Sequence, residues 1–255
     1  MPIEIVTVPC LSDNYAFLIH DDASGSTALV DVPEARPILQ TLESRGWTLD
    51  EVWITHHHDD HVQGLGAILD RHDATVRGAA ADSHRLPALD VKLVDEDHFD
   101  FAGHDVRVMD VSGHTVGHIA YYMADAGAVF TADSLMALGC GRLFEGSAEQ
   151  MWASLSKLAA LPAETLVCSG HEYTAANAKF ALTIDPDNSD LISRAGSISE
   201  ARASKTPTVP STLALELKTN PFLRAADPAI RVLLNKKQAS DADVFAEIRA
   251  RKDAF

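Results

Sequence analysis

The stretch Thr55–His61, with the sequence T-H-H-H-D-D-H, limits what this chain can be more than any other feature. It follows directly on the apolar run Glu51–Ile54, which we predict to be a β-strand. Residues two apart in an extended segment point the same way, so His56 and His58 can bind one ion. The stretch closes with two further potential ligands, Asp60 and His61. The sequence therefore predicts a metal-binding loop at the end of a strand.

Three more potential ligands stand just past predicted strands, namely His114, Asp133 and His171. Proteins built on sheets tend to collect functional groups in such loops. The whole set contains imidazoles and carboxylates and no thiolate, which suits zinc, iron or manganese. Asp133 is the isolated acid, and the two oxygens of a carboxylate can bridge ions about 3.5–4 Å apart. These residues predict a site for two divalent metal ions.

The first two-thirds of the chain alternate short apolar runs with polar loops. The predicted strands are Ile3–Val8, Tyr15–His20, Thr27–Asp31, Glu51–Ile54, Val106–Asp110, Ile119–Met123, Val129–Thr131 and Thr165–Cys168. The predicted helices are Glu34–Arg45, Val62–Arg71, Ala148–Leu158 and one that runs from Glu172 to Ala181 or beyond. Consecutive strands interrupted by helices predict sheets that pack on each other and are covered by helices.

After His171 the pattern becomes helical, and we predict a domain boundary near residue 172. The further predicted elements are helices at Leu191–Ala203, Asp227–Asn235 and Asp241–Arg251, the last two with an Asp as N-cap, and a loop at Lys205–Ser211. Residues 1–172 carry a net charge of −18, whereas residues 173–255 carry +2. This asymmetry predicts two units with different tasks, a metal-binding domain at 1–172 and a substrate-binding domain at 173–255.

Composition narrows the partners of the chain. A formal net charge of −16 argues against nucleic acid or an anionic membrane as a partner. The sequence contains no run of about 18 apolar residues that would predict a membrane-spanning helix. The cysteines Cys10, Cys140 and Cys168 are too far apart for a disulfide framework or a zinc finger. We expect a cytoplasmic, monomeric protein that acts on a small molecule.

The order of the motifs resembles the metallo-β-lactamase superfamily: T-H-x-H-x-D-H, then G-H-T-x-G-H, then an Asp after a strand, then G-H. The resemblance implies an α+β fold, an αββα sandwich with the metals at one edge, followed here by a smaller α-helical C-terminal domain. It implies that His56, His58 and His114 bind the first metal, that Asp60, His61 and His171 bind the second, and that Asp133 bridges them. His57 and Asp59 fall on variable positions of the motif, and His118 falls on a structural one.

Four further segments resemble the glyoxalase II (hydroxyacylglutathione hydrolase) family, and they are Gly139–Ser147, Gly170–Thr174, Thr219–Arg224 and Arg249–Asp253. The resemblance implies hydrolysis of S-D-lactoylglutathione to D-lactate and glutathione. The residues that match substrate-binding positions are Arg142, Phe144, Tyr173, Arg249 and Lys252. Basic side chains suit the two carboxylates of glutathione. Phe144 stands where many family members have Tyr, so one hydroxyl hydrogen bond is lost.

The chemistry implied is attack by hydroxide. Two divalent ions, zinc first and iron or manganese as alternatives, lower the pKa of a bound water from about 15.7 toward 7. Asp60 and Asp133 are then the catalytic carboxylates beside a metal-bound hydroxide. A nucleophilic Cys140 is the alternative, but the sequence shows no base near it, and we expect this residue to pack in the core.

Three other functions fit parts of the pattern. The nearest is a glutathione persulfide dioxygenase of the same superfamily with a single iron, which the helical tail with Arg249 and Lys252 disfavours. A non-catalytic binding protein is disfavoured by the complete ligand set, because buried acids and histidines cost stability without a metal. A nuclease is disfavoured by the net charge of −16 and the lack of a basic stripe.

Overall fold

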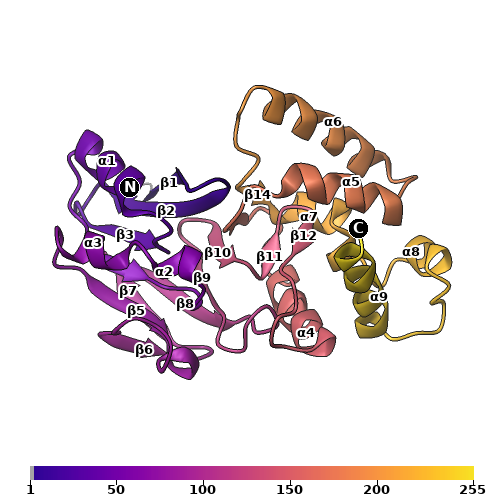
Figure 1. Ribbon diagram of the computed structural model, residues 1–255, viewed down its shortest axis with the longest axis horizontal. Coiled ribbons are helices and arrows are strands. Elements are labelled where there is room, and N and C mark those ends of the chain that lie inside the picture. The colour runs from indigo at the N-terminus through magenta and orange to yellow at the C-terminus, as the bar shows by residue number, and fades with distance from the viewer. Residues whose placement is uncertain (1–2) are drawn as a thin grey trace. The chain divides into compact units, whose positions relative to one another are not determined.

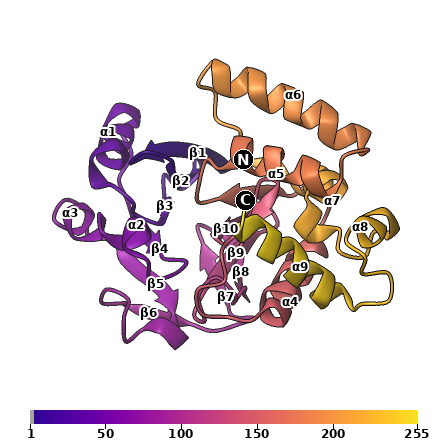
Figure 2. The same ribbon diagram turned by 45° about the vertical axis from the view of Figure 1, so that its right-hand side comes forward.

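The computed structural model describes residues 3–255 and divides into two compact units. The first unit contains the chain up to Asp110 together with Val116–Ala132, and the second contains Val111–Thr115 together with Asp133–Phe255. Figures 1 and 2 show the strands concentrated in the first unit and most of the helices in the second. None of the helices in residues 3–255 combines the length and apolar character needed to cross a membrane.

A six-stranded sheet forms one layer of the first unit. Its strands, in spatial order, are β1 (Ile3–Cys10), β2 (Asn14–Asp21), β3 (Thr27–Val30), β4 (Glu51–Trp53), β5 (Thr75–Ala79) and β6 (Val91–Leu93). The first three strands form an antiparallel meander, and β3 to β6 run parallel. Parallel neighbours need crossover connections, which α1 (Ala35–Arg45) supplies between β3 and β4. The carboxyl ends of β3 and β4 therefore lie at the same edge of this sheet.

A second sheet of the first unit packs against the first. Its antiparallel strands are β7 (His98–Phe101), β8 (His104–Asp110), β9 (Ile119–Met123) and β10 (Ala128–Ala132). The ring of Trp53 on β4 lies 5.2 Å from the ring of Phe99 and 5.4 Å from that of Tyr121. The Tyr121 hydroxyl donates a hydrogen bond to the Ile54 carbonyl at 2.9 Å. Aromatic packing and this bond fix the two sheets face to face just below the metal-binding loop.

The second unit is mainly helical. It contains the hairpin of β11 (Leu135–Met136) and β12 (Gly139–Cys140), the pair of β13 (Leu166–Ser169) and β14 (Ser211–Thr212), and the helices α4 (Ala148–Ala159), α5 (Thr174–Ile184), α6 (Ser189–Ala203), α7 (Leu213–Thr219), α8 (Pro228–Leu233) and α9 (Asp241–Asp253). Helices α5 and α6 share a core with the hairpin through Leu138, Ala181 and Leu191. Asn220 donates to the carbonyls of Met136 and Gly139, so the helical part holds the hairpin in place.

Most predicted elements are present, within a few residues of their predicted ends. The prediction of one helix at Val62–Arg71 is wrong, because the chain forms the two short helices α2 (Asp59–Val62) and α3 (Leu65–Leu69). Gly64 separates them and sits so close to α1 that a Cβ there would meet the Ala35 nitrogen at 2.8 Å. The strands β5, β6, β7, β11, β12 and β14 and the helix α7 were not predicted, since their short runs lack clear periodicity.

The two Asp N-caps predicted in the tail have different outcomes. Asp227 does cap α8, and its carboxylate accepts a hydrogen bond from the Ala229 backbone nitrogen at 2.8 Å. The prediction that Asp241 caps α9 is wrong, because Ser240 holds that position. The Ser240 hydroxyl accepts from the Asp243 nitrogen at 3.1 Å in a capping box.

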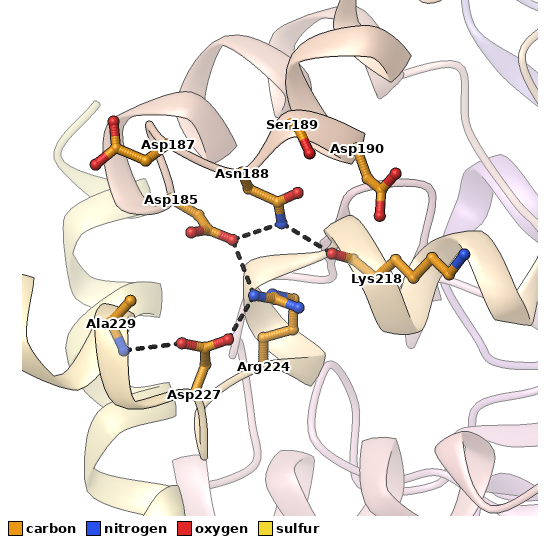
Figure 3. Close-up of a pocket in the computed structure, with 9 residues that line it drawn as sticks. All are labelled: Asp185, Asp187, Asn188, Ser189, Asp190, Lys218, Arg224, Asp227 and Ala229. Atoms are coloured by element: carbon orange, nitrogen blue, oxygen red, sulfur yellow. Dashed lines mark hydrogen bonds and ion pairs between the residues drawn. The ribbon is translucent and has the colours of Figure 1, made fainter.

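A surface pocket of the second unit is lined by Asp185, Asp187, Asn188, Ser189, Asp190, Lys218, Arg224, Asp227 and Ala229 (Figure 3). None of the predicted site residues lines it. Arg224 lies 3.2 Å from a carboxylate oxygen of Asp185 and 2.5 Å from one of Asp227. These ion pairs join the end of α5 to the start of α8. Arg224, which belongs to the segment Thr219–Arg224 that resembles glyoxalase II, therefore has a structural role here.

Candidate metal centre

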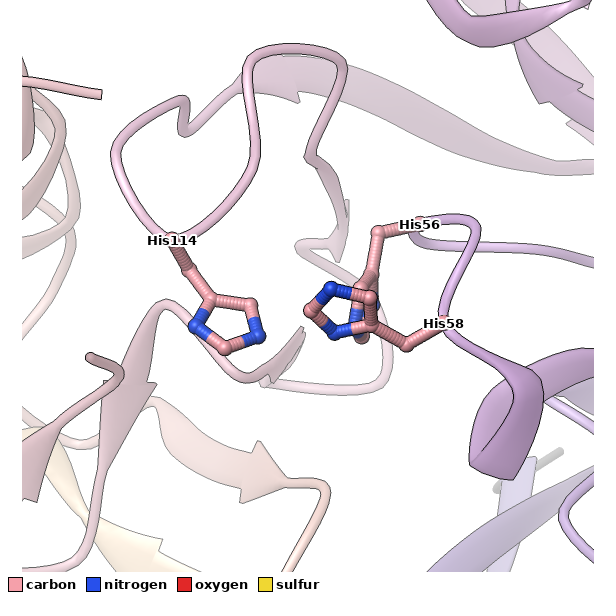
Figure 4. A group of neighbouring side chains, drawn as sticks. All are labelled: His56, His58 and His114. Atoms are coloured by element: carbon pink, nitrogen blue, oxygen red, sulfur yellow. The ribbon is translucent and has the colours of Figure 1, made fainter. Parts of the chain in front are cut away.

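The loop after β4 places two imidazoles at the spacing of metal ligands. The Nε2 atom of His56 lies 3.1 Å from the Nδ1 atom of His58. Two ligands that each lie about 2.0–2.1 Å from a tetrahedral zinc ion are about 3.3–3.4 Å apart. Figure 4 shows these two rings on one loop, and also draws His114, which belongs to a loop of the second unit. The predicted pairing of His56 and His58 on one ion fits this geometry.

The next two predicted ligands occupy the first helical turn after the loop. His61 is fully buried, and its Nε2 atom lies 3.7 Å from a carboxylate oxygen of Asp60. The same Asp60 oxygen accepts a hydrogen bond from the Asn14 side chain at 2.9 Å. Asn14 also donates to the Asp60 backbone carbonyl at 3.1 Å, so one amide from β2 fixes both groups of this residue.

Asp31, which is not among the predicted site residues, also contacts the predicted metal-binding loop. It is 2% exposed, and it accepts hydrogen bonds from the Thr55 nitrogen and hydroxyl at 2.8 Å each. The Asp31 oxygen that accepts from the Thr55 hydroxyl also lies 2.8 Å from Nδ1 of His61. The Thr55 hydroxyl lies 3.0 Å from Nδ1 of His56. Asp31 thus orients two predicted ligand rings, His61 directly and His56 through Thr55, and leaves Nε2 of each for a metal.

The position of Asp31 follows from the parallel pairing of β3 and β4. Its backbone nitrogen donates to the Trp53 carbonyl at 3.1 Å, which places the residue beside the start of the metal-binding loop. The ligand atoms of Asp31, His56 and His61 lie within 4.8 Å of one another, close enough to hold an ion. We assign Asp31 an orienting role instead, because its two oxygens already accept three hydrogen bonds. The only sequence signal is an acid at the end of the predicted apolar strand Thr27–Asp31.

The second unit brings its three predicted ligands together. One oxygen of Asp133 lies 3.5 Å from Nε2 of His114, and the other lies 3.3 Å from Nε2 of His171. All three side chains are at least nine-tenths buried. Nδ1 of His114 lies 2.8 Å from the Arg142 carbonyl, which selects the tautomer that presents Nε2. The two Asp133 oxygens therefore face two different imidazoles, as a bridging carboxylate requires.

The hairpin beside these ligands needs a glycine. A Cβ at Gly141 would meet the Asp133 carbonyl oxygen at 1.9 Å and Nδ1 of His114 at 2.9 Å. Helix α4 supports the other side, because the Ser154 hydroxyl donates to the Ser112 carbonyl at 2.7 Å. The G-C-G segment thus serves close packing against the ligands.

Three neighbouring residues predicted not to be ligands have other contacts. Nδ1 of His57 lies 3.0 Å from a carboxylate oxygen of Asp82. Asp59 is exposed in the first turn of α2. His118 is fully buried and stacks on His56, with ring centroids 4.6 Å apart and an interplanar angle of 11°. Flat stacking against the ring of His56, a predicted ligand, is a packing contact.

Two aromatic side chains of the second unit lie beside its predicted ligand histidines. The ring of Phe144 lies 5.2 Å from that of His114, and the ring of Tyr173 stacks on His171 at 4.7 Å. Phe144 is 62% exposed and Tyr173 is 41% exposed, although both are large. Exposed aromatic side chains next to buried polar groups offer a surface for a ligand.

A cluster of three cations lies near these aromatics in the second unit. The Arg249 guanidinium is buried and donates to the Cys140 carbonyl at 3.0 Å and to Asp253 at 2.9 Å. Arg142 is exposed, with its Nε atom 3.6 Å from the same Asp253 carboxylate. Partial burial lowers the pKa of the Lys252 ammonium, and the charges of Arg249 and Arg142 lower it further against the opposing effect of Asp253. One acid faces three cations, so the cluster has a local excess of positive charge.

Cys140 has the environment of a packing residue. It is buried beside Arg249, and burial raises the pKa of its thiol to about 11. The thiol is therefore protonated at neutral pH and is a poor nucleophile. The nucleophilic alternative is disfavoured, in agreement with the prediction from the sequence.

Known proteins match this chain over its whole length. Residues 13–171 match the family described as "Metallo-beta-lactamase superfamily", and residues 172–255 match the family described as "Hydroxyacylglutathione hydrolase C-terminus". A hydroxyacylglutathione hydrolase of Roseobacter denitrificans is 76% identical, and one of Ruegeria pomeroyi is 67% identical, each over 100% of both chains. The chain belongs to the hydroxyacylglutathione hydrolase family.

Solved structures agree on the fold. The crystal structure of TTHA1623 in a di-iron-bound form is 25% identical, covers 86% of this chain and 100% of its own, and superposes with a TM-score of 0.61. The predicted fold class is confirmed, a metallo-β-lactamase fold followed by a helical C-terminal region. The hydroxyacylglutathione hydrolase relatives also do not favour the dioxygenase alternative.

Membership of this family and the donor sets make the chain a hydrolase that depends on divalent metal ions. The donors fit such ions, because imidazole and carboxylate groups lie at ligand spacing in both units. The predicted domain boundary near residue 172 stays a prediction. The family matches meet at 171 and 172, whereas the second compact unit consists of Val111–Thr115 and Asp133–Phe255. This unit therefore includes three of the seven predicted ligands, His114, Asp133 and His171.

Proposed function

We propose that this chain hydrolyses S-D-lactoylglutathione to D-lactate and glutathione with two divalent metal ions. The proposed ligands are His56, His58 and His114 for one ion and Asp60, His61 and His171 for the other, with Asp133 as the bridge. The observation that carries the two-ion proposal is the Asp133 carboxylate, whose two oxygens face different imidazoles at 3.5 and 3.3 Å. Zinc is the proposed ion, and iron or manganese suits the same donors.

Bound metal ions would supply hydroxide at neutral pH and polarise the thioester carbonyl. The residues of the chain have the task of holding those ions rigidly. Asp31 and Thr55 hold the rings of His56 and His61, and the Arg142 carbonyl holds His114. Asp60 and Asp133 are the two carboxylates proposed to act at the reacting centre. A fixed arrangement of this kind avoids reorganisation during the reaction.

The cation cluster of Arg142, Arg249 and Lys252 is the proposed binding site for the carboxylates of glutathione. Burial lowers the pKa of Lys252 most, the charges of Arg249 and Arg142 lower it further, and a bound carboxylate would relieve the repulsion among the three cations. Arg142 and Lys252 are accessible and are proposed to contact the substrate directly. Arg249 is buried and bonded to Cys140 and Asp253, so we propose that it contributes mainly its charge.

Phe144 and Tyr173 are proposed to pack on the peptide part of glutathione. Their rings are exposed next to His114 and His171, which are proposed metal ligands. Apolar contact excludes water from the thioester and orients it without adding charge. The Phe144 ring supplies this packing but lacks the hydroxyl of a tyrosine.

The test is an assay of thioester hydrolysis across a series of acyl-glutathiones, with metal content measured on the same sample. We expect hydrolysis of S-D-lactoylglutathione and about two metal ions per chain. Chelation should abolish the activity, and added zinc should restore it. One iron per chain, together with oxygen uptake in the presence of glutathione persulfide and no hydrolysis, would instead support the dioxygenase. A metal content near two with no thioesterase activity would leave the site but refute the substrate.

We also propose that the protein acts as a cytoplasmic monomer on this small molecule, with no nucleic acid or membrane as a partner. The net charge of −16 supports the absence of anionic partners. Free cysteines at Cys10, Cys140 and Cys168 fit a reducing compartment. Measurement of the molar mass in solution tests the monomer.

A further inference from the structure

Asp82 is a buried carboxylate that contacts two segments of the predicted metal site within the first unit. It closes the short 3-10 helix Ala80–Asp82 after β5 and is 2% exposed. One of its oxygens lies 3.0 Å from Nδ1 of His57. A Cβ at Gly117 would meet the Asp82 Cγ atom at 2.1 Å, so the G-H-T-x-G-H segment packs directly on this carboxylate.

Arg85 fixes the orientation of this carboxylate. Its Nε and Nη2 atoms donate to the other Asp82 oxygen at 3.0 and 2.8 Å. The two oxygens thus have different partners, because one faces the guanidinium and the other faces the His57 ring. Charge-assisted bonds of this kind are shorter and stronger than neutral ones. The carboxylate cannot rotate without breaking contacts on both sides.

His57 lies in the sequence between two proposed ligands of one ion. The rings of His56 and His58 stay 4.8 Å apart, and the His57 ring lies 6.5 Å from the first and 4.9 Å from the second. A contact that holds the His57 side chain also limits the backbone torsions on which its two neighbours depend. Metal sites need their ligands within about 0.5 Å of the productive geometry.

We propose that Asp82 is a positioning residue, which holds His57 and thereby sets the spacing of His56 and His58. This inference rests on the proposed function, since it assumes that these two histidines bind a metal. The hydrogen bond from the ring to a carboxylate resembles the outer contacts that orient metal-bound histidines, although His57 is not itself a proposed ligand. The role belongs to the first unit alone, and the residues proposed to contact the substrate belong to the second.

The test compares Asp82→Asn with a matched control, Glu51→Gln. Glu51 is also a carboxylate of the first unit, with 14% of its side chain exposed. It accepts two hydrogen bonds from the Arg77 guanidinium at 2.9 Å and one from the Trp53 ring N–H at 2.7 Å. It stands at the start of β4, away from the loop. Both variants remove one negative charge from a similar network, so a general loss of stability should appear in both.

We expect Asp82→Asn to weaken zinc binding about 10–100-fold, the usual effect of losing an outer contact in a metal site. Zinc affinity is measured by competition with a coloured chelator, which requires no enzymatic activity. In limiting zinc the variant should lose kcat, excess zinc should restore part of it, and KM for S-D-lactoylglutathione should stay unchanged. Glu51→Gln should bind zinc as the natural protein does.

A double-mutant cycle tests whether the effect passes through His57. His57→Ala should weaken zinc binding as much as Asp82→Asn, and the two changes together should add little. Full additivity would overturn the proposal, as would natural zinc affinity in Asp82→Asn or an equal loss in Glu51→Gln. If Asp82→Asn does not fold, Arg85→Gln replaces it, and an unchanged zinc affinity there would likewise overturn the role.

The same measurements separate this proposal from the proposed function. A natural protein that binds no zinc, or that binds zinc without hydrolysing the thioester, contradicts the function. A natural protein that does both, beside an Asp82→Asn variant of equal zinc affinity, contradicts the role of Asp82 alone.

Discussion

The two units orient their predicted metal ligands in different ways. In the first unit, buried acids have this role. Asp31 faces the predicted ligand His61 and Thr55, and Asp82 faces His57, which lies between two predicted ligands. In the second unit, a backbone group orients a predicted ligand, since the carbonyl of Arg142, a proposed substrate-binding residue, faces Nδ1 of His114. In the proposed site, the first unit therefore has residues for metal binding alone, whereas the second has proposed metal ligands and proposed substrate contacts in the same short segments.

Variants in the two units should therefore behave differently. Changes to the acids of the first unit should affect metal affinity and kcat and leave KM alone. Changes around Arg142 and Lys252 in the second unit should raise KM, because these side chains are proposed to meet the substrate in both ground and transition states. The separation of effects is therefore a test of the division of labour between the units.

The largest expected effect is that of Asp133→Ala. Loss of the proposed bridge removes a ligand from both ions, and metal catalysis contributes several kcal/mol, so kcat should fall by about 10³-fold or more. The measurement is kcat together with the metal content of the purified variant, which should drop below that of the natural protein. Unchanged turnover with full metal content would exclude Asp133 from the centre.

Asp31→Asn should have the next largest effect. The amide keeps the shape but cannot accept all three hydrogen bonds that reach the carboxylate, so the rings of His56 and His61 lose their support. Zinc affinity should fall about 10–100-fold while KM stays constant. Chelator competition and steady-state kinetics in excess zinc measure the two quantities. A rise in KM without a change in zinc affinity would break the contrast between the units.

The predicted ligands could be proposed from the sequence because they lie in short motifs that follow predicted strands. Residues that can bind metal directly follow apolar strands, and this pattern identified the loop Thr55–His61 and the residues His114, Asp133 and His171. Within each unit these residues meet as donors at ligand spacing. The sandwich of sheets was also predictable, since runs of strands interrupted by helices have few ways to pack.

The residues that support the ligands were not predictable in the same way. Asp31 and Asp82 are single acids among 37 acidic residues, and nothing local distinguishes them from surface groups. Their roles depend on parallel pairing, which brings the end of β3 beside the loop after β4, and on a close approach that Gly117 permits. Burial of the Arg249 guanidinium likewise depends on the packing of α9, and basic residues alone indicate an exposed cation.

A smaller effect concerns pH and belongs to the second unit. The pKa of Lys252 is lowered from its ordinary 10.5, so the ammonium loses its proton before the solution reaches that pH. Since the charged form is proposed to bind a glutathione carboxylate, KM should rise, by up to about tenfold, as pH increases toward 10.5. Lys252→Arg keeps its charge throughout this range and should give a flatter KM profile. Identical profiles for the two proteins would exclude Lys252 from substrate binding.

The smallest expected effect is a gain from Phe144→Tyr. The ring is 62% exposed beside His114, so an added hydroxyl reaches water or a ligand without entering the core. A hydrogen bond contributes about 0.5–1.5 kcal/mol, which corresponds to a KM lowered by about 2–10-fold. Steady-state kinetics with S-D-lactoylglutathione measure this change, and Phe144→Leu is the control that removes the ring. If the tyrosine variant leaves KM unchanged while the leucine variant raises it, the ring acts by packing alone. If neither substitution changes KM, Phe144 does not contact the substrate. The proposed substrate contacts next to the proposed metal ligands of the second unit would then rest mainly on the cations Arg142, Arg249 and Lys252.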